Sequence, residues 1–258
     1  MLQSTFCHVP GVGSHTEGSL WQQGCLTWTD YLQDPRSFSI GGANKTYFKK
    51  FLNTSVQSLE KREYRFFAQS LGAREAWRAW PDFRNRCVYL DIETDGGQSG
   101  ESITMVGLYD GADFTCLVKG VDLDEFPDVI ARYSMVVTFF GSGFDVPMLK
   151  RAFPHVAIDQ IHLDLCHTLK RVGYRGGLKK IEKQLGILRG AETDGLSGYD
   201  AIRLWQQYQR GRDKALETLI EYNREDVVNL ERLAQIAYDR LKAAAFSEAG
   251  LPELSAKF

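Results

Sequence analysis

The stretch that decides the fold is CVYLDIET at residues 87–94. The run Val88–Leu90 is apolar and leads into Asp91 and Glu93, which lie two positions apart. In a β-strand, residues two apart point to the same face, so the two carboxylates share one face at the end of the strand. Carboxylates held side by side repel each other unless a cation lies between them. The stretch therefore predicts a buried strand that ends in a negatively charged site.

Two more strands are expected directly after this one. Apolar runs at 103–109 and 114–118 are flanked by short loops rich in Gly, Asp and Ser, which favour turns. Three consecutive strands joined in this way are most simply antiparallel. The pattern then alternates, with a helix at 123–133, a strand at 135–139, a helix from about 145, a strand at 161–163 and a closing helix at 214–242. This order predicts an α/β domain with helices layered on a mixed sheet.

The first 85 residues show the pattern of short helices. Helical segments are expected at 14–23, 27–32, 44–56 and 59–80, the last interrupted near Gly72. Ser14 and Thr27 are suited to cap the first two helices, and Pro81 should end the helical run. The sequence thus predicts a small all-helical N-terminal region at 1–85, followed by an α/β domain at 86–258.

Composition and charge exclude several classes of protein. Of the 258 residues, 43% are apolar and 25% are charged, which excludes a disordered chain, a collagen-like fibre and a coiled-coil rod. We expect no membrane association, because no apolar run is long enough to span a bilayer. The N-terminus shows no secretory signal and the five cysteines form no C-x-x-C pair, so we expect reduced thiols and a cytoplasmic location. The net charge of −2 is unevenly distributed, since residues 1–86 carry 11 basic and 7 acidic side chains.

Acidic side chains also stand at the ends of later elements. Asp145 opens a helix directly after a strand, and Asp164 does the same after the next strand. On the closing helix, Tyr222 and Asp226 are four residues apart and therefore share a face. Each feature has an ordinary explanation, because a carboxylate can cap a helix or lie at a solvated strand edge. Together, and in this order, they indicate an all-oxygen site of the kind that Mg²⁺ or Mn²⁺ prefers.

These residues resemble the motifs of the DEDD (DnaQ-like) exonuclease superfamily. The matching segments are Asp91–Thr94, Phe144–Leu149, Asp164 and Tyr222–Asp226. The spacing of Tyr222 and Asp226 is similar to that of the tyrosine subclass, DEDDy. Val137–Lys150 and Glu221–Leu230 further resemble the YprB-type ribonuclease H-like domain. The resemblance covers about residues 86–242 and implies a ribonuclease H-like mixed sheet flanked by helices.

The resemblance also implies a metal-dependent 3′–5′ exonuclease that uses two divalent ions, Mg²⁺ or Mn²⁺. Asp91, Glu93 and Asp226 would hold the ion that activates water. Asp91 would bridge to a second ion, Asp145 would support that ion, and Tyr222 would orient the attacking water. Two such ions clamp the attacking and leaving oxygens of an in-line displacement at phosphorus. Asp164 matches a frequent acidic position of the YprB type but is not one of the four catalytic carboxylates.

The expected substrate is single-stranded nucleic acid with a free 3′ end, DNA in preference to RNA, degraded to nucleoside monophosphates. Thr94, Phe140 and Phe144 lie in or beside the motifs and are candidates for substrate contact. Family members commonly carry asparagine at the position of Phe140, so a ring that could stack on a base replaces an amide. A core position for this ring is the competing interpretation.

Three alternative functions stay open at this point. The first is an exoribonuclease that trims RNA, and the second is a non-catalytic nucleic-acid-binding module on the same fold. The third is a subunit whose N-terminal region docks a partner nuclease or helicase. A lost carboxylate would favour the second alternative, and none of the four is lost here.

Two further features bear on nucleic-acid binding. The residues after Asp164 form a basic run, which suits either phosphate contact or a solvated helix face: Lys170, Arg171, Arg175, Lys179, Lys180 and Lys183. Near the N-terminus, VPGVG at residues 9–13 precedes an expected helix and resembles a helix-hairpin-helix element. Gly11 and Gly13 would let backbone N–H groups approach a phosphate at the helix start. Packing, or docking of a protein partner, is the alternative.

Overall fold

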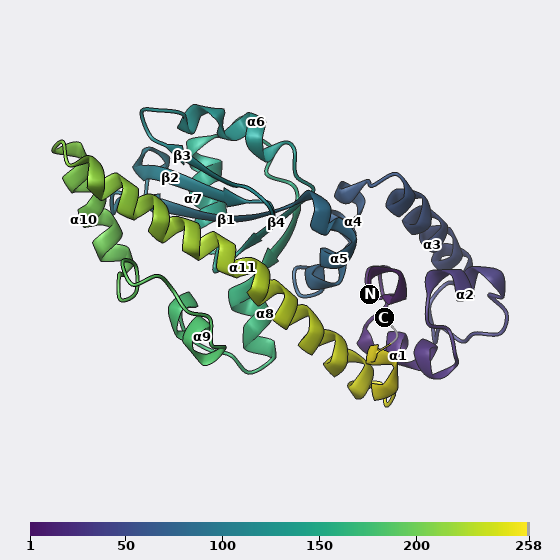
Figure 1. The fold of residues 1–258 in the computed structure, drawn as a ribbon. Helices are drawn as coiled ribbons and strands as arrows, with labels where there is room; N and C mark the ends of the chain where they lie inside the picture. Colours follow the sequence, from purple (N-terminus) through teal and green to yellow (C-terminus); the bar gives the residue numbers. More distant parts are fainter. Residues whose placement is uncertain (257–258) are drawn as a thin grey trace.

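A computed structural model describes residues 1–256, and its centre is a five-stranded sheet (Figure 1). The strand order across the sheet is β3-β2-β1-β4-β5. The strands are β1 (Cys87–Thr94), β2 (Ile103–Tyr109), β3 (Phe114–Val118), β4 (Met135–Thr138) and β5 (Ile161–Asp164). The strand that carries Asp91 and Glu93 therefore lies in the middle of the sheet.

The sheet is mixed, as predicted. β2 is antiparallel to both β1 and β3, whereas β4 is parallel to β1 and β5 is parallel to β4. Parallel neighbours need a crossover connection, which the helices α6 (Phe126–Ile130) and α7 (Asp145–Ala152) supply. The carboxyl ends of β1, β4 and β5 consequently lie at the same end of the sheet, where the acidic motifs are.

The remaining helices lie before β1 or after β5 in the chain. Those before it are α1 (Ser14–Gln22), α2 (Trp28–Gln33), α3 (Lys45–Glu60), α4 (Tyr64–Ser70) and α5 (Trp80–Phe83). Those after β5 are α8 (Leu165–Arg171), α9 (Leu178–Gln184), α10 (Gly198–Gln209) and α11 (Asp213–Glu248). Short 3₁₀ turns complete the set: η1 (Leu2–Ser4), η2 (Ala76–Ala79), η3 (Arg84–Arg86), η4 (Gly100–Ser102), η5 (Leu123–Glu125) and η6 (Pro252–Ala256). The N-terminal region is helical, as predicted.

Alternation along β1 separates the two faces of the sheet. Tyr89 belongs to a hydrophobic cluster that contains residues of α11, whereas Val88 and Leu90 belong to a second cluster that contains residues of α6 and α7. Because side chains alternate along a strand, Asp91 and Glu93 lie on the face of Tyr89. The acidic pair therefore faces α11.

The longest helix, α11, reaches both parts of the molecule. At 1.5 Å per residue, its 36 residues span about 54 Å, and Figure 1 shows it running from α10 at one end to α1 at the other. Near its C-terminal end, the rings of Phe246 and Trp21 lie 4.7 Å apart, and Gln22 Nε2 donates a hydrogen bond to Ala249 O at 2.8 Å. Among residues 1–256, no helix combines the length with the apolar character that crossing a bilayer requires.

The N-terminal helices share a hydrophobic cluster with the sheet. Buried side chains of this cluster include Phe48 of α3 and Trp77 of η2, together with Tyr89 of β1 and Leu230 of α11. The N-terminal region thus packs directly against the α/β part. A domain boundary at residues 85 and 86 stays a prediction, because apolar contacts cross it.

Three details of the predicted helices are wrong. The expected helix at 59–80 is broken at 61–63, where Arg62 has a left-handed φ of 56°, so α3 ends at Glu60 and α4 begins at Tyr64. The residue that caps α1 is Gly13 and not Ser14, although Thr27 caps α2 as predicted. Pro81 lies in the first turn of α5. A proline is tolerated there because its missing N–H would have no partner in the helix.

Candidate active site

Three carboxylates meet where β1 ends beside α11. Asp91 and Glu93 come from β1 and Asp226 comes from α11, and each offers an oxygen within 4.8 Å of the others. Asp145 begins α7 and is 3% exposed, and its Oδ1 accepts a hydrogen bond from the backbone N–H of Ile92 at 3.1 Å. The fold therefore brings together all four acidic residues that the sequence motifs single out.

Burial raises the pKa of all four carboxyl groups. The pKa of Glu93 rises to about 8, that of Asp145 to about 7 and that of Asp226 to about 6, in each case chiefly because burial disfavours the charged form. Burial also raises the pKa of Asp91 well above its ordinary value, and the charges of Asp145 and Asp226 add to the effect. Buried carboxylates in excess of nearby cations are a favourable setting for a divalent ion.

Asn223 connects the two carboxylates of β1. Its Nδ2 donates to Asp91 Oδ2 at 3.1 Å and to Glu93 Oε1 at 3.3 Å. Gly107, which pairs with Asp91 across the sheet, leaves room for this amide, because a Cβ there would lie 1.6 Å from Asn223 Oδ1. Neither Asn223 nor Gly107 was predicted as a site residue. A glycine inside an apolar strand is the signal that could have revealed the close approach.

Arg189 is the largest omission from the predicted site. It lies in the loop between α9 and α10, its side chain is 4% exposed, and its Nη2 forms an ion pair with Asp226 Oδ1. The same guanidinium pairs with Glu182, Nε to Oε2, at 2.7 Å, and Glu182 is itself 1% exposed. Asp226 therefore faces a fixed positive charge, which leaves most of the unbalanced negative charge on Asp91 and Glu93. Nothing in the local sequence distinguishes Arg189 from a surface arginine.

The loop that carries Arg189 is held by the residue next to Asp226. Glu225 Oε1 accepts a hydrogen bond from the backbone N–H of Gly190 at 2.6 Å, and its Oε2 accepts one from the hydroxyl of Thr193. Thr193 is 1% exposed. Two adjacent residues of α11 thus have different tasks, because Glu225 fixes the loop and Asp226 belongs to the acidic group.

Tyr222 is held by Lys179, one of the basic residues that the sequence singles out. Lys179 Nζ donates to Tyr222 Oη at 2.8 Å and also to the backbone carbonyl of Leu196. Burial lowers the pKa of Lys179, whereas burial together with the neighbouring carboxylates raises the pKa of Tyr222. An ammonium group has only donors. The phenol oxygen therefore accepts this bond, and its own hydrogen is free for another acceptor.

Asp164 fixes the loop between β4 and α7. It caps α8 by accepting from Cys166 N at 3.0 Å, which confirms helix capping as its local role. It also accepts from the backbone N–H of Phe140 at 2.9 Å and from Ser142, whose N–H lies at 3.0 Å and whose hydroxyl lies at 2.5 Å. Asp164 therefore positions the segment that leads into Asp145.

Phe140 in that loop has a left-handed backbone conformation, with φ of 66°. This conformation costs a residue other than glycine about 1–2 kcal/mol, and asparagine adopts it more readily than phenylalanine. The hydrogen bond to Asp164 holds the backbone in place, and Gly143 leaves space for the ring, because a Cβ there would lie 2.7 Å from a ring carbon. The Phe140 side chain is 50% exposed, so the competing interpretation of a core position is wrong.

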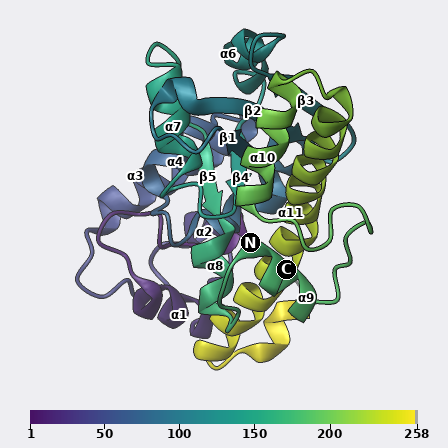
Figure 2. The same ribbon diagram turned by 90° about the vertical axis from the view of Figure 1, so that its left-hand side faces the viewer.

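A pocket of about 660 Å³ lies at the carboxyl ends of β1 and β4. Figure 2 shows that α7 and α10 flank the sheet in this region. The predicted site residues that line it are Asp91, Glu93, Thr94, Phe140, Phe144, Asp145, Tyr222 and Asp226. Tyr199 at the start of α10 lines it as well and is 81% exposed. This tyrosine was not predicted as a site residue, because its part of the chain matches no motif. Three exposed aromatic rings therefore surround the acidic group.

The basic residues between positions 170 and 183 contact different parts of the molecule and do not form one surface. Lys179 is the residue of this run that reaches Tyr222. Arg171 donates to the backbone carbonyl of Arg74 and lies 3.7 Å from Glu75, beside the N-terminal region. Lys183 pairs with Asp194 at 3.4 Å. The other three side chains are exposed and do not line the pocket: Lys170, Arg175 and Lys180.

The N-terminal glycines lie outside this pocket. Gly11 has a positive φ of 82°, and Gly13 precedes α1. Before this turn the chain forms the 3₁₀ turn η1. The nearby backbone N–H groups of Phe6 and Cys7 donate to the carboxylate of Glu17, at 2.6 and 3.2 Å. The carboxylate of Glu17 therefore occupies the backbone N–H groups of Phe6 and Cys7, which a phosphate would otherwise contact.

A comparison of the sequence with protein-family models identifies the superfamily of this chain. A family model of the RNase H superfamily matches residues 88–238, which include all four carboxylates and Tyr222. This chain belongs to the RNase H superfamily. The N-terminal helices lie outside the matched segment, so the superfamily fold accounts for the sheet, α6 to α10 and most of α11.

A solved structure supports the RNase H-like architecture. The chain is similar to a family B DNA polymerase from the hyperthermophilic archaeon Pyrobaculum calidifontis, with a TM-score of 0.51 and 16% sequence identity. The similarity covers 66% of this chain and 27% of the polymerase chain. This chain thus corresponds to about a quarter of that protein, and the comparison shows a shared fold. No curated protein sequence matches this member of the RNase H superfamily.

The acidic group predicts how stability depends on pH and on divalent ions. Its carboxyl groups hold their protons to a pH of about 6 to 8 in the folded state, but only to about 4 in the unfolded state. The unfolded state therefore binds fewer protons between these values, so the free energy of unfolding should fall as pH rises from about 4 to about 8. Thermal melts in EDTA across this range should show the fall.

Addition of Mn²⁺ should reverse this loss near the upper end of the range. A ligand at about 100 times its dissociation constant stabilises the folded state by about 2.7 kcal/mol. Asp124→Asn, at an exposed position far from the pocket, serves as the control and should behave like the unmodified protein. A melting temperature that ignores Mn²⁺ at a pH of about 8 would contradict a metal site at Asp91.

Proposed function

We propose that this protein is a metal-dependent 3′–5′ exonuclease that hydrolyses single-stranded nucleic acid, preferably DNA, to nucleoside monophosphates. Membership in the RNase H superfamily supports a nuclease in general, but a fold hosts many functions and the site must carry the argument. The observation that carries it is one pocket in which Asp91, Glu93 and Asp226 lie within 4.8 Å of one another beside Tyr222. This combination suits the hydrolysis of a phosphodiester.

The acidic group suits two divalent ions, because its donors are all carboxylate oxygens and, of the four, Asp226 alone has an ion-pair partner within residues 1–256. Asp91, Glu93 and Asp226 would hold one ion, and Asp91 and Asp145 the other. Ions bound there lower the pKa of water and neutralise charge on the attacking and leaving oxygens. Asn223 keeps Asp91 and Glu93 in position through its two donated hydrogen bonds. Magnesium and manganese both match this oxygen-rich donor set.

Tyr222 is placed to orient the attacking water. Its oxygen accepts from Lys179, so its hydrogen is the group that can be donated toward the reacting centre. In the reaction, a water oxygen attacks phosphorus in line with the leaving 3′ oxygen. The P–O3′ bond breaks, the water loses a proton, and the leaving oxygen takes one up from solvent. Lys179 thus acts on the reaction by fixing the direction of the tyrosine hydroxyl.

The aromatic rings favour a single-stranded substrate. Phe140, Phe144 and Tyr199 are 50%, 39% and 81% exposed, and all three line the pocket. Unpaired bases stack on such rings, and the stacking tolerates any sequence because every base has a π-face. A duplex end does not offer its bases in this way. The rings do not discriminate DNA from RNA, so trimming of RNA is the alternative within the same reaction.

The test of the proposed function is a gel assay with oligonucleotides labelled at either end. DNA and RNA of the same sequence are incubated with Mg²⁺, Mn²⁺ or EDTA. We expect a ladder of shortened products from the 5′-labelled DNA and early release of the label from the 3′-labelled DNA, both abolished by EDTA. Early release of a 5′ label as mononucleotide, before any ladder of shortened products, would contradict the proposed polarity, and faster shortening of RNA would favour the alternative.

Tyr222→Phe should reduce turnover without abolishing it. The ring still packs and the carboxylates remain, so the lost element is the hydroxyl that orients water. Groups of this kind contribute about 10²–10⁴-fold to the rate. Single-turnover rates on a labelled oligonucleotide measure the effect, with Tyr133→Phe, outside the pocket, as the control. A Tyr222→Phe protein with unchanged turnover would show that the hydroxyl has no part in the reaction.

Phe140→Gly should weaken substrate binding with little change in stability. Loss of a stacking ring costs about 1–3 kcal/mol of binding, which raises KM for short oligonucleotides by roughly 5-fold to 150-fold. Glycine relieves the strain of the positive φ, and this gain offsets the lost packing of a half-exposed ring. Leu188→Ala, an exposed apolar residue outside the pocket, should change neither quantity. A strongly lowered melting temperature with unchanged KM would contradict the stacking role.

A further inference from the structure

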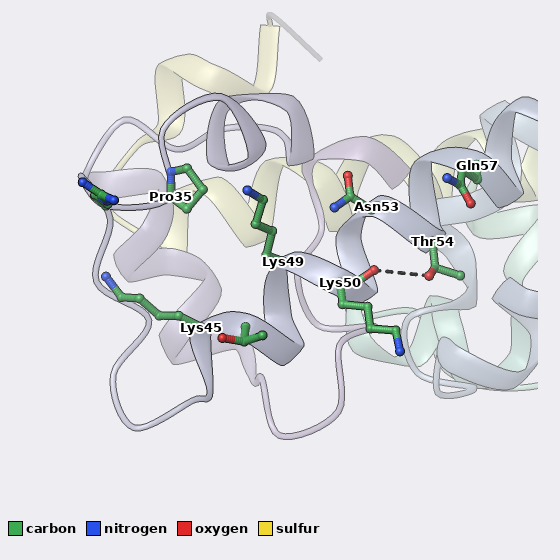
Figure 3. A pocket seen from close by; sticks show the side chains of 9 residues that line it. Pro35, Lys45, Lys49, Lys50, Asn53, Thr54 and Gln57 are labelled. Atoms are coloured by element: carbon green, nitrogen blue, oxygen red, sulfur yellow. Dashed lines mark hydrogen bonds between the residues drawn. The ribbon is translucent and has the colours of Figure 1, made fainter.

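A basic groove lies along α3 of the N-terminal region, well apart from the acidic pocket. It has a volume of about 650 Å³ (Figure 3). Its lining consists of polar and cationic side chains and one proline: Pro35, Arg36, Lys45, Thr46, Lys49, Lys50, Asn53, Thr54 and Gln57. No carboxylate lines it. We refer to it below as the α3 groove.

Among the described residues, the three lysines of the α3 groove have no carboxylate partner within ion-pair distance, whereas Arg36 has the carboxylate of Asp34 nearby. Arg36, Lys45, Lys49 and Lys50 are all exposed, and none of them belongs to the ion pairs found within residues 1–256. Lys45 Nζ donates to the backbone carbonyl of Phe38 at 2.9 Å, which leaves its charge unpaired. These four cations, of which only Arg36 has a carboxylate nearby, repel one another, and a polyanion lying in the groove would remove that repulsion.

The helix arranges these side chains in rows. Lys45, Lys49 and Asn53 follow each other at intervals of four residues, as do Lys50 and Thr54. Residues four apart lie on the same face of a helix, about 6 Å apart along its axis. Figure 3 shows these side chains projecting from α3 along the groove. The hydroxyl of Thr54 donates to the backbone carbonyl of Lys50 at 3.2 Å. The cationic groups are followed by the side-chain amides of Asn53 and Gln57, which is a surface suited to successive phosphates along a strand.

We propose that the α3 groove binds the phosphate backbone of the nucleic-acid strand whose 3′ end lies in the acidic pocket. This inference rests on the proposed function, because it takes the substrate to be a nucleic acid. The glycine turn at 9–13 is a weaker candidate for this contact. The cleft beside that turn has three arginines, Arg74, Arg78 and Arg171, but also Glu17, Glu75 and Glu248. Its charges cancel, whereas those of the α3 groove do not.

The position of the α3 groove predicts a dependence on substrate length. In Figure 1, α3 lies at the end of the molecule opposite α10, which flanks the acidic pocket. A short oligonucleotide held in the pocket leaves the groove empty, whereas a longer strand reaches both. The groove therefore adds more affinity for long strands, which contact both places at once, than for short ones, which contact one place at a time. Its contribution is electrostatic and falls with salt.

The experiment compares two double charge reversals in the full chain. Lys49→Glu with Lys50→Glu alters the groove, and glutamate keeps the helix propensity of lysine. Arg132→Glu with Lys214→Glu makes the same change in net charge at exposed positions outside both sites and serves as the control. Binding of single-stranded DNA of about 30 and about 5 nucleotides is measured by fluorescence anisotropy in EDTA, as a function of salt. Hydrolysis by the unmodified protein is measured separately.

We expect the groove variant to bind the long strand at least about tenfold more weakly, with a shallower dependence of log K on log salt by about 0.7 for each lost contact. The fold-change for the short strand should be smaller than that for the long strand, and the control variant should behave like the unmodified protein. Equal affinity of the groove variant and the control for the long strand would overturn the inference while leaving hydrolysis, and so the proposed function, intact. Absence of metal-dependent hydrolysis by the unmodified protein would instead contradict the proposed function.

Discussion

Asp91→Asn is expected to abolish hydrolysis and to make the metal-free protein more stable. Asp91 is the carboxylate shared by both proposed ion sites, so its loss removes ligands that no neighbour replaces. A drop of at least about 10³-fold in turnover follows if each ion contributes several kcal/mol to the transition state. Stability should rise because the pKa of Asp91 is raised in the folded state, and an amide needs no proton there.

Two measurements check this expectation. Turnover is followed on a labelled oligonucleotide with Mn²⁺, and the melting temperature is followed in EDTA at a pH of about 8, where the unmodified carboxylates repel each other. Asp124→Asn removes one exposed carboxylate elsewhere and should leave both quantities unchanged. A folded Asp91→Asn protein with normal turnover would end the two-ion assignment.

Arg189→Met is expected to cause the largest loss of stability among single changes around the site. Glu182 is 1% exposed and relies on the guanidinium of Arg189, with Asn229 as its other donor. Removing one partner of a buried ion pair leaves an uncompensated charge and costs about 3–5 kcal/mol. Methionine keeps the length and apolar volume of the side chain, so the loss reports the charge more than the packing.

A double change separates charge from packing. Adding Glu182→Gln to Arg189→Met removes the stranded charge and should recover most of the lost free energy of unfolding, measured by urea denaturation in EDTA. Arg203→Met serves as the control, because Arg203 is 76% exposed and lies 4.0 Å from Asp200. An Arg189→Met protein as stable as the unmodified one would show that the fold does not depend on the ion pair between Arg189 and Glu182.

Much of the sheet and of the acidic group could be predicted because the signals are local. The period of two in β1 places Asp91 and Glu93 on one face, and the spacing of four in α11 places Tyr222 beside Asp226. The turn residues between β1, β2 and β3 indicate antiparallel pairing without any knowledge of the rest. In each case the residues that determine the strand pairing or the shared face lie within about ten positions of one another.

The parts that could not be predicted depend on contacts between distant segments. Arg189 reaches Asp226 only because Glu225 fixes the loop between α9 and α10. Asn223 reaches Asp91 only because Gly107 stands opposite it on β2. The basic run does not form one continuous surface, and this too depends on contacts with distant segments. Arg171 and Lys179 are eight positions apart, but Arg171 contacts the N-terminal region and Lys179 contacts Tyr222.

The left-handed backbone conformation of Phe140 was also not predicted. An aromatic residue is not expected at a positive φ, and the sequence between β4 and α7 gives no warning of it. The reason lies 24 positions later, where Asp164 accepts the hydrogen bond that holds the backbone. The position that departs from the family pattern is thus the one where tertiary contacts outweigh local preference.

The continuity of α11 has a consequence for how the molecule unfolds. Asp226 and Phe246 belong to the same helix, one in the acidic group and the other against Trp21 of α1. Unfolding the N-terminal helices would expose the apolar side chains of the last turns of α11, and unfolding β1 would expose those around Leu230. The two events are therefore coupled in free energy. An ion or nucleotide bound at Asp226 would also protect α1 against transient opening, and a substitution that weakens the packing of Trp21 would destabilise the part of α11 that carries Asp226.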